Sequence, residues 1–270
     1  MPTLRISDAD AIAYDDAGQG RLVVLVHGSP GTSRAWQPVA ERLAPRFRVI
    51  SLNLPGYGGT TRPTGEGPGD SSYAAGLIEA LVAHVGPPAV LAGHSYGGAV
   101  ALVTALRGRV VPGALALFEP VAIPVLAAVG ETEAFAAAQV LFEGYCAAFE
   151  RGDPGAVRIM VDYWFGAGAL DQMPAPMRDF LVAHTGHNVR DIRATFRDVY
   201  SVAALRGLTM PVLCAVGSRS PAMTGKIVEA IASRAARGMI KKLEKANHAM
   251  TTTHADAVAA LIEELADGSA

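Results

Sequence analysis

The stretch that decides the fold reads Val90-Leu91-Ala92-Gly93-His94-Ser95-Tyr96-Gly97-Gly98-Ala99. Its first residues form an apolar run typical of a strand, and residues 99–106 continue as an apolar segment typical of a buried helix. Between them lies a Gly-x-Ser-x-Gly pattern, which marks a nucleophile elbow when a strand turns directly into a helix. Such a turn strains the backbone at Ser95, and side chains at positions 93 and 97 would collide with neighbouring backbone. The pattern predicts an exposed, nucleophilic Ser95 hydroxyl above a helix N-terminus that favours negative charge.

The same pattern could arise by chance, because the chain contains 29 glycines and a motif alone is only a hypothesis. The strand before it and the helix after it are the context that a nucleophile elbow requires. The surrounding sequence therefore favours a functional Ser95 over coincidence.

The composition is that of an ordinary globular protein. A chain of 270 residues is long enough for one large domain or for a core domain with an insertion. Half of the residues are hydrophobic, the formal net charge is −2, and no basic stripe predicts a nucleic-acid partner. Cys146 and Cys214 lie far apart in apolar surroundings, so we expect reduced core residues rather than a disulfide or a metal pair.

No segment convincingly predicts a membrane association. The N-terminal residues lack the long apolar region of a signal peptide. Residues 110–130 are apolar and about as long as a membrane span, but they contain three prolines and Glu119. A strand followed by a proline-rich loop fits this segment better. We therefore expect a soluble, cytoplasmic protein without membrane or nucleic-acid partners. Its expected partner is a small-molecule substrate, and a monomer and a homodimer both stay open.

Strand and helix patterns alternate along the chain and are interrupted once. An N-terminal hairpin is expected at residues 4–14, and continuous apolar runs predict parallel strands buried on both faces at 22–26, 49–52, 90–92 and 114–118. Only helical patterns follow, at residues 131–150, 154–164, 176–184 and 188–204. Strands then resume at 212–216 and 239–243, with helices at 223–235 and 256–265. This order predicts an α/β core made of residues 1–120 and 206–270, with an inserted helical lid at residues 121–205.

Two further segments accompany the elbow, namely His27-Gly28-Ser29-Pro30-Gly31 and Leu54-Pro55-Gly56-Tyr57-Gly58. With these three motifs in this order, the chain resembles the α/β-hydrolase family over essentially its whole length. The resemblance implies a mostly parallel eight-stranded sheet flanked by helices. It also implies a catalytic triad whose members follow one another as nucleophile, acid and histidine.

The resemblance points to His248 as the histidine of this triad. The segment Lys241–Asn247 looks like the last strand and the loop that carries the family's histidine, from which an imidazole can take the serine proton. His254 is the competitor, but it lies where the final helix begins, so we expect it to cap that helix or face solvent.

The acid departs from the family's usual pattern. Many members carry an Asp in a Gly-x-x-Asp setting after the strand at 212–216, whereas this chain has Gly217-Ser218-Arg219-Ser220. Either the triad is degenerate or the acid comes from elsewhere. Glu119, at the end of the strand 114–118, resembles the acid position of some members, including certain haloalkane dehalogenases. An ionised carboxylate in so apolar a run is costly unless it is paired, and His248 would be such a partner. Alternatively, Glu119 caps the first lid helix or meets an arginine.

The remaining site residues follow from the same resemblance. Backbone N–H groups of Ser29 and Tyr96 are the expected oxyanion donors, and His94, Tyr145 and Trp164 are candidates for the substrate pocket. His184 and His187 could suggest a metal pair, but Gly186 and the lack of a third ligand favour a polar turn. No phosphate-binding glycine motif is present. We therefore expect neither a cofactor nor a metal.

The resemblance implies a serine hydrolase that cleaves a small carboxylic ester, a lactone or a related acyl substrate through an acyl-enzyme at Ser95. A serine nucleophile counts against epoxide hydrolase and dehalogenase chemistry, which use an aspartyl ester in this family. Carbon–carbon bond hydrolysis and perhydrolysis use the same triad and stay open. So does a protein of another class, which binds its ligand without turnover, because the usual strand-end Asp is missing at Ser220.

Overall fold

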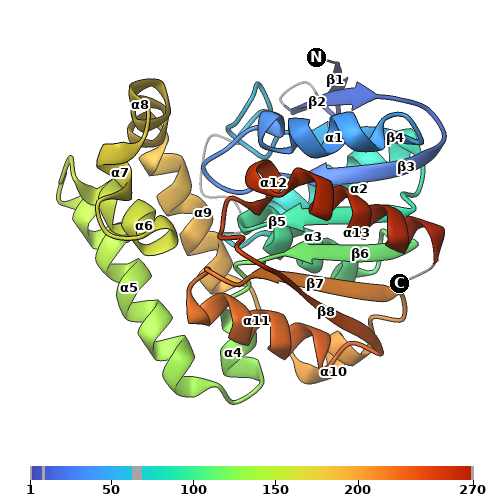
Figure 1. The fold of residues 1–270 in the computed structure, drawn as a ribbon. Helices are drawn as coiled ribbons and strands as arrows, with labels where there is room; N and C mark the ends of the chain where they lie inside the picture. Colours follow the sequence, from blue (N-terminus) through green and yellow to red (C-terminus); the bar gives the residue numbers. More distant parts are fainter. Residues whose placement is uncertain (1, 8–9, 63–68, 269–270) are drawn as a thin grey trace.

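The structure is a computed structural model that describes residues 2–7, 10–62 and 69–268. Eight strands form one sheet in the order β1-β2-β4-β3-β5-β6-β7-β8 (Figure 1). Their bounds are Thr3–Arg5, Ala11–Ala17, Arg21–Val26, Phe47–Leu52, Val90–His94, Ala114–Phe118, Pro211–Gly217 and Arg237–Leu243, for β1 to β8 in turn. Strand β2 is antiparallel to β1 and β4, and the other pairs are parallel. The mostly parallel eight-stranded sheet predicted from the sequence is thus confirmed.

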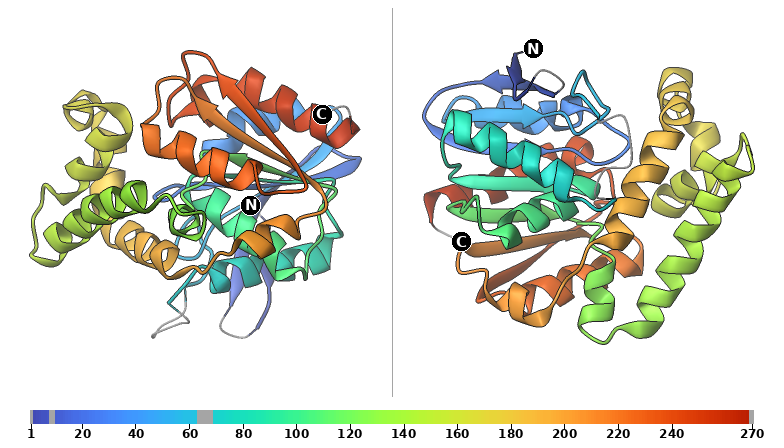
Figure 2. Two further views of the ribbon diagram at one scale, coloured as in Figure 1. Left: turned by 90° about the horizontal axis from the view of Figure 1, so that it is seen from below. Right: turned by 180° about the vertical axis from the view of Figure 1, so that it is seen from behind.

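Helices cover both faces of the sheet (Figures 1 and 2). The core helices are η1 (Ser33–Trp36), α1 (Gln37–Leu43), α2 (Ser72–Val85), α3 (Tyr96–Arg107), α4 (Pro124–Ala128), α11 (Ala222–Ala232), α12 (Met250–Thr253) and α13 (Ala255–Asp267). In β3, Val23 and Leu25 pack in the core on the side of α1 and α13, whereas Val24 and Val26 pack on the side of α2 and α3. Successive side chains of a strand point to opposite faces, so a continuous apolar run is the sequence that a doubly covered strand needs.

A helical insert lies between β6 and β7, beside the edge of the sheet where the parallel strands end (Figure 1). We call helices α5–α10 of this insert the lid. Its helices are α5 (Thr132–Glu150), α6 (Ala156–Phe165), α7 (Ala169–Gln172), α8 (Ala175–Ala183), α9 (Thr185–Arg197) and α10 (Val202–Arg206). Figures 1 and 2 show that α5–α9 stand to one side of the sheet, whereas α10 lies below β8 and next to the core. The inserted helical lid expected from the sequence is confirmed.

One predicted lid helix is wrong in extent. The pattern at residues 188–204 predicts a single helix, but α9 ends at Arg197 and the chain is extended at Asp198, with ψ at 139°. The Asp198 carboxylate accepts hydrogen bonds from the N–H and the hydroxyl of Ser71, both at 2.8 Å. Burial raises the pKa of Asp198 to about 6 despite these contacts. This anchor to the start of α2 interrupts a helix that local propensity would continue.

Cys146 and Cys214 are both buried and both free of a disulfide, as the sequence predicts. Among the described helices, none has the length and apolar character that crossing a membrane requires.

The turn between β5 and α3 holds Ser95 in a strained backbone conformation of positive φ, with φ at 55° and ψ at −125°. Glycine is required on both sides of it. A Cβ atom on Gly93 would lie 2.3 Å from the carbonyl oxygen of Gly97. A Cβ on Gly97 would lie 2.3 Å from the carbonyl oxygen of His27. Backbone packs so closely on backbone here that positions 93 and 97 have no room for a side chain, and only glycine fits at either.

We predict that Gly97→Ala lowers the free energy of unfolding by about 3 kcal/mol, because the new methyl group overpacks against rigid backbone. The matched control is Gly76→Ala in the middle of α2, where a Cβ meets nothing within 4 Å. It should stabilise the protein by about 0.5–1 kcal/mol through helix propensity. Urea denaturation of both variants checks the pair, and equal effects would contradict the account of the elbow.

Candidate active site

Three side chains meet at the edge where the parallel strands end. Ser95 follows β5, Glu119 follows β6, and His248 lies in the loop after β8. The Nε2 atom of His248 is 3.0 Å from Ser95 Oγ, and its Nδ1 atom is 2.6 Å from Glu119 Oε2. All three residues are buried, so the prediction of an exposed Ser95 hydroxyl is wrong. Residues found through separate motifs are thus joined in one hydrogen-bonded chain.

The Glu119 carboxylate is fully buried, with 0% of the residue exposed. Its other oxygen, Oε1, accepts a hydrogen bond from the backbone N–H of Gly217 at 2.7 Å. Burial by itself raises the pKa of Glu119, but the hydrogen bond and charge of His248, together with Ser220 and Gly217, outweigh it. The net effect is a lowered pKa, so the carboxylate is ionised at neutral pH. Its contacts in the described structure are these groups rather than an arginine or a lid-helix N-terminus.

The strand-end position that lacks an Asp has another role in this structure. The hydroxyl of Ser220 is buried and lowers the pKa of Glu119, although it makes no hydrogen bond of ordinary geometry with any described residue. Ser218 accepts a hydrogen bond from the N–H of Lys245 at 2.7 Å, and the Arg219 N–H donates to the carbonyl of Ala246. The segment after β7 therefore braces the histidine loop, while the carboxylate comes from the neighbouring strand β6.

The turn after β3 packs directly against the nucleophile. A Cβ atom on Gly28 would lie 2.9 Å from Ser95 Cβ. The His27 ring stiffens this turn, since Nδ1–H donates to the Gly28 carbonyl at 2.7 Å and Nε2 accepts from the N–H of Leu54 at 3.0 Å. Burial lowers the pKa of His27 to about 4, which keeps the ring neutral. The next residue in the turn is Ser29.

The two N–H groups expected to bind an oxyanion are unused. Within the part of the chain that the structure describes, neither the Ser29 N–H nor the Tyr96 N–H donates a hydrogen bond. Tyr96 is the first residue of α3, where backbone N–H groups have no partner inside the helix. Neither N–H group is therefore committed to a partner in the described part of the chain.

Two of the three candidate pocket residues contact His248. The indole of Trp164, from α6, stacks on the imidazole with ring centroids 3.8 Å apart and planes 12° apart. His94 lies on another side, where its Nε2–H donates to the His248 carbonyl at 2.8 Å. Burial and the neighbouring His248 lower the pKa of His94 to about 3, so His94 is a neutral donor. The lid and the elbow together hold the imidazole in place.

The third candidate, Tyr145, lies in a buried network that the sequence analysis missed. Its hydroxyl donates to Asn188 Oδ1 at 2.9 Å, and Asn188 in turn contacts Ser29. Asp191, one turn further along α9, accepts hydrogen bonds from Ser29 and Tyr57. The spacing of Asn188 and Asp191, three residues apart on one helix face, is the signal that could have drawn attention to them.

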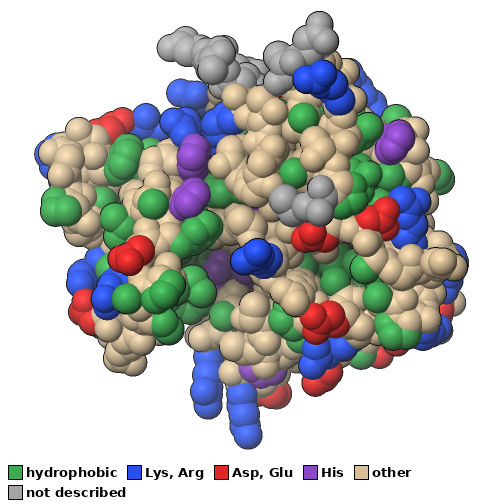
Figure 3. Space-filling model, turned by 90° about the horizontal axis from the view of Figure 1, so that it is seen from above, with side chains coloured by type: hydrophobic (Ala, Val, Ile, Leu, Met, Phe, Trp, Pro, Cys, Tyr) green, Lys and Arg blue, Asp and Glu red, His purple; other side chains and the backbone are tan. Residues whose placement is uncertain are grey.

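The two lid histidines pack against Tyr57 of the core. His184 stacks on Tyr57 with centroids 5.9 Å apart, and His187 meets the same ring edge-on at 5.6 Å. The described residues contain no group of three His, Cys, Asp or Glu side chains that could hold a metal ion. Figure 3 shows histidine side chains gathered along the boundary where the lid meets the core.

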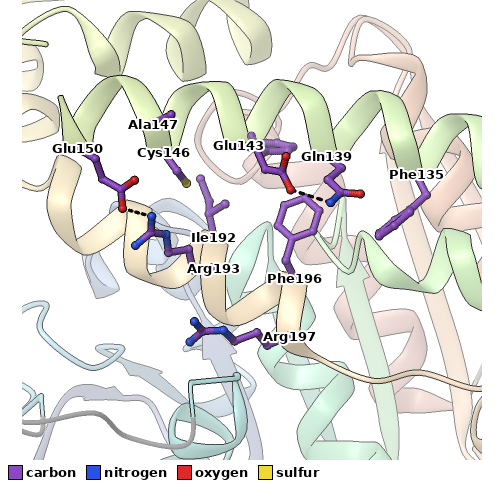
Figure 4. Close-up of a pocket in the computed structure, with 11 residues that line it drawn as sticks. Phe135, Gln139, Glu143, Cys146, Ala147, Glu150, Ile192, Arg193, Phe196 and Arg197 are labelled. Carbon is purple, nitrogen blue, oxygen red and sulfur yellow. Dashed lines mark hydrogen bonds and ion pairs between the residues drawn. The ribbon is translucent and has the colours of Figure 1, made fainter.

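A surface groove of about 650 Å³ lies elsewhere, between α5 and α9 (Figure 4). Its apolar lining includes Phe135, Phe142 and Phe196, and its charged side chains include the paired Glu150 and Arg193. None of Ser95, Glu119 and His248 lines it. The groove is therefore a feature of the lid and is separate from the three-residue chain.

Parts of the chain are similar in sequence to known hydrolases. A segment of 95 residues is 41% identical to 2-hydroxy-6-oxo-2,4-heptadienoate hydrolase of Pseudomonas putida, covering 34% of each chain. A segment of 100 residues is 37% identical to the pimeloyl-[acyl-carrier protein] methyl ester esterase of Vibrio cholerae, covering 36% of each. These matches span about a third of the relatives' length.

The solved esterase of Exiguobacterium antarcticum has the same fold. It superposes with a TM-score of 0.76 at 20% sequence identity and 98% coverage of both chains. Residues 23–261 match the alpha/beta hydrolase family. This chain is a member of the alpha/beta hydrolase family.

Proposed function

We propose that this protein is a serine hydrolase that cleaves a small-molecule carboxylic ester, or a lactone or related acyl substrate, through an acyl-enzyme at Ser95. The observation that carries the proposal is the buried hydrogen-bonded chain from Glu119 through His248 to Ser95, with contacts of 2.6 and 3.0 Å. Family membership supports hydrolytic chemistry. The unused N–H groups of Ser29 and Tyr96 provide donors for an oxyanion.

The first half-reaction uses these groups in a defined order. His248 Nε2 takes the proton of the Ser95 hydroxyl as Oγ attacks the acyl carbon. The carbonyl oxygen becomes an oxyanion, to which Ser29 and Tyr96 donate hydrogen bonds. His248 then gives the proton to the leaving alkoxide, which departs as the alcohol. The acyl group is left on Ser95.

The second half-reaction repeats these steps with water. His248 takes a proton from water as the hydroxide attacks the acyl-enzyme, and then returns that proton to Ser95 Oγ as the acid is released. Glu119, ionised because its pKa is lowered, holds His248 Nδ1–H and balances the charge of the imidazolium. Trp164 adds a face-on aromatic contact, and a cation above an indole face is stabilised by the ring quadrupole.

An ester is the first substrate class because related proteins include a methyl ester esterase. A second candidate reaction is carbon–carbon bond hydrolysis, favoured by the 41% identity over 95 residues to 2-hydroxy-6-oxo-2,4-heptadienoate hydrolase. The alternative of a binding protein without turnover rested on the missing Asp at Ser220. The contact of Glu119 with His248 supports turnover over this alternative, because it offers a carboxylate for the role of the missing Asp.

We predict that Ser95→Ala lowers the turnover of p-nitrophenyl acetate by more than about 10⁴-fold, because it removes the nucleophile. The matched control is Ser233→Ala, which changes an exposed serine at the end of α11 and should leave turnover within about twofold. Steady-state kinetics checks both variants. Residual activity of the Ser95 variant near the wild-type rate would contradict the proposal. Folded wild type that consumes no ester, lactone or diketone substrate would favour the binding protein.

We predict that Glu119→Gln lowers kcat by about 10²–10⁴-fold, since the amide cannot support the imidazolium and favours the wrong tautomer of His248. The control is Asp16→Asn, which alters an ion pair with Arg48 far from the site and should change kcat by less than about twofold. Equal, small losses in the two variants would show that Glu119 is not the acid.

The same variant has a pH signature in its stability. The folded state lowers the pKa of Glu119 below its usual 4.5, so the ionised carboxylate stabilises the fold above that pH. This contribution is lost as the pH falls through the folded-state value. The difference in unfolding free energy between wild type and Glu119→Gln should therefore shrink below pH 4.5. Urea denaturation between pH 7 and about pH 3 measures it, since the loss falls below the unfolded-state pKa. A difference that grows in acid would contradict the lowered pKa.

A further inference from the structure

We propose that the lid helix α9 positions the oxyanion turn, with Asn188 and Asp191 as positioning residues that hold Ser29. This inference rests on the proposed hydrolase function, in which the Ser29 N–H is an oxyanion donor. It goes beyond that function because it makes the oxyanion site a joint structure of core and lid.

Asn188 holds Ser29 at two points. Its Nδ2 atom donates to the carbonyl oxygen of Ser29 at 2.8 Å and lies 2.9 Å from the Ser29 hydroxyl. A carbonyl oxygen can only accept, so the NH₂ end of the amide must face the turn. The Tyr145 hydroxyl donates to the opposite end, Oδ1, at 2.9 Å. Both ends of the buried amide are therefore engaged, and its orientation is fixed.

Asp191 holds the same residue from one turn further along α9. Its Oδ2 atom accepts hydrogen bonds from the Ser29 hydroxyl at 2.7 Å and from the Tyr57 hydroxyl at 2.9 Å. Its Oδ1 atom accepts from the Arg62 guanidinium at 2.6 Å. Asp191 is buried. Burial raises its pKa, and the Arg62 guanidinium and the hydroxyls of Ser29 and Tyr57 oppose that rise. The Ser29 hydroxyl thus has a fixed acceptor and a fixed donor.

These contacts bear on the donor geometry because they act on the residue that carries it. Ser29 follows Gly28, whose backbone packs against Ser95. The Ser29 N–H lies in the Gly28–Ser29 peptide, whose carbonyl oxygen accepts a hydrogen bond from His27 Nδ1–H. Asn188 and Asp191 hold the other side of the Ser29 Cα through its own carbonyl and hydroxyl, so the residue is anchored from both sides. An oxyanion donor works only when it lies about 2.7–3.1 Å from the position that the oxygen reaches in the transition state. A small shift of α9 would move the Ser29 N–H out of that range.

The arrangement also has a consequence for specificity. A substrate that fits beneath the lid without displacing α9 keeps Ser29 in place and is turned over. A substrate that binds but pushes α9 outward would lose the donor and react slowly. The lid then selects substrates through the rate of the chemical step as well as through binding.

The test compares Asn188→Ala with Thr195→Val. Thr195 is also buried on α9, where its hydroxyl donates to the Asp191 carbonyl at 3.1 Å, without contact to Ser29. For Asn188→Ala we expect kcat to fall about 10–100-fold, less than the loss of a whole donor, with KM within about twofold. Its affinity for a trifluoromethyl ketone, whose adduct with Ser95 carries an oxyanion, should fall by the same factor. Its affinity for the carboxylic acid product should stay within about twofold, and Thr195→Val should match wild type.

A second variant guards against misfolding of the first. Tyr145→Phe removes only the hydroxyl that orients Asn188, and kcat should fall about 2–10-fold, as expected for one lost hydrogen bond. Thermal unfolding reports whether each variant is folded. Wild-type kcat in folded Asn188→Ala, an equal loss in Thr195→Val, or an equal loss of product affinity would each overturn the inference.

The failure of this inference and the failure of the proposed function give different results. Wild type that turns over an ester in a Ser95-dependent manner, with Asn188→Ala equally active, contradicts the positioning role alone. Wild type that neither turns over the substrate panel nor forms a ketone adduct on Ser95 contradicts both.

Discussion

The hydrogen bond between His248 Nδ1 and the buried Glu119 carboxylate, 2.6 Å long, is the interaction on which the site depends. A fully buried carboxylate costs several kcal/mol unless it is paired and hydrogen-bonded. The imidazole supplies the pairing, and the Gly217 N–H supplies a second bond. Glu119 follows β6, Gly217 is the last residue of β7, and His248 follows β8, so the two bonds tie the ends of three strands together. The position of Ser95 at the end of β5 then places its hydroxyl within reach of the imidazole.

The lid also contacts two parts of the proposed active site, namely the His248 imidazole and the turn that carries Ser29. Trp164 covers one face of the His248 imidazole, the ring whose Nε2 atom carries the proton in the proposed reaction. Helix α9 contacts the Ser29 turn. In this account the core provides the nucleophile, the acid and the base, while the lid fixes how the base and the oxyanion donors are presented. Changes in the lid would therefore alter rate as well as substrate choice.

The sequence alone predicts those parts of the site that depend on neighbouring residues in the chain. The elbow could be predicted because only glycine fits where backbone meets backbone, and Glu119 stood out as a charge inside an apolar strand. The contacts of Asn188 and Asp191 could not be predicted in the same way. Their partner Ser29 lies about 160 residues earlier in the chain, and helical periodicity does not report which distant loop a face will meet. The end of α9 at Arg197 could not be predicted for the same reason. The contact that interrupts the helix joins Asp198 to Ser71, which lies in a distant part of the chain.

The central claim is that Ser95 carries the acyl group during turnover. Rapid quenching of wild type with p-nitrophenyl acetate in the millisecond range, followed by peptide mass spectrometry, tests it directly. The account predicts one added acetyl mass on the peptide that contains Ser95, which forms at the rate of the p-nitrophenol burst and decays at kcat. Turnover without an acylated Ser95, or with the acetyl group on another residue, would contradict it.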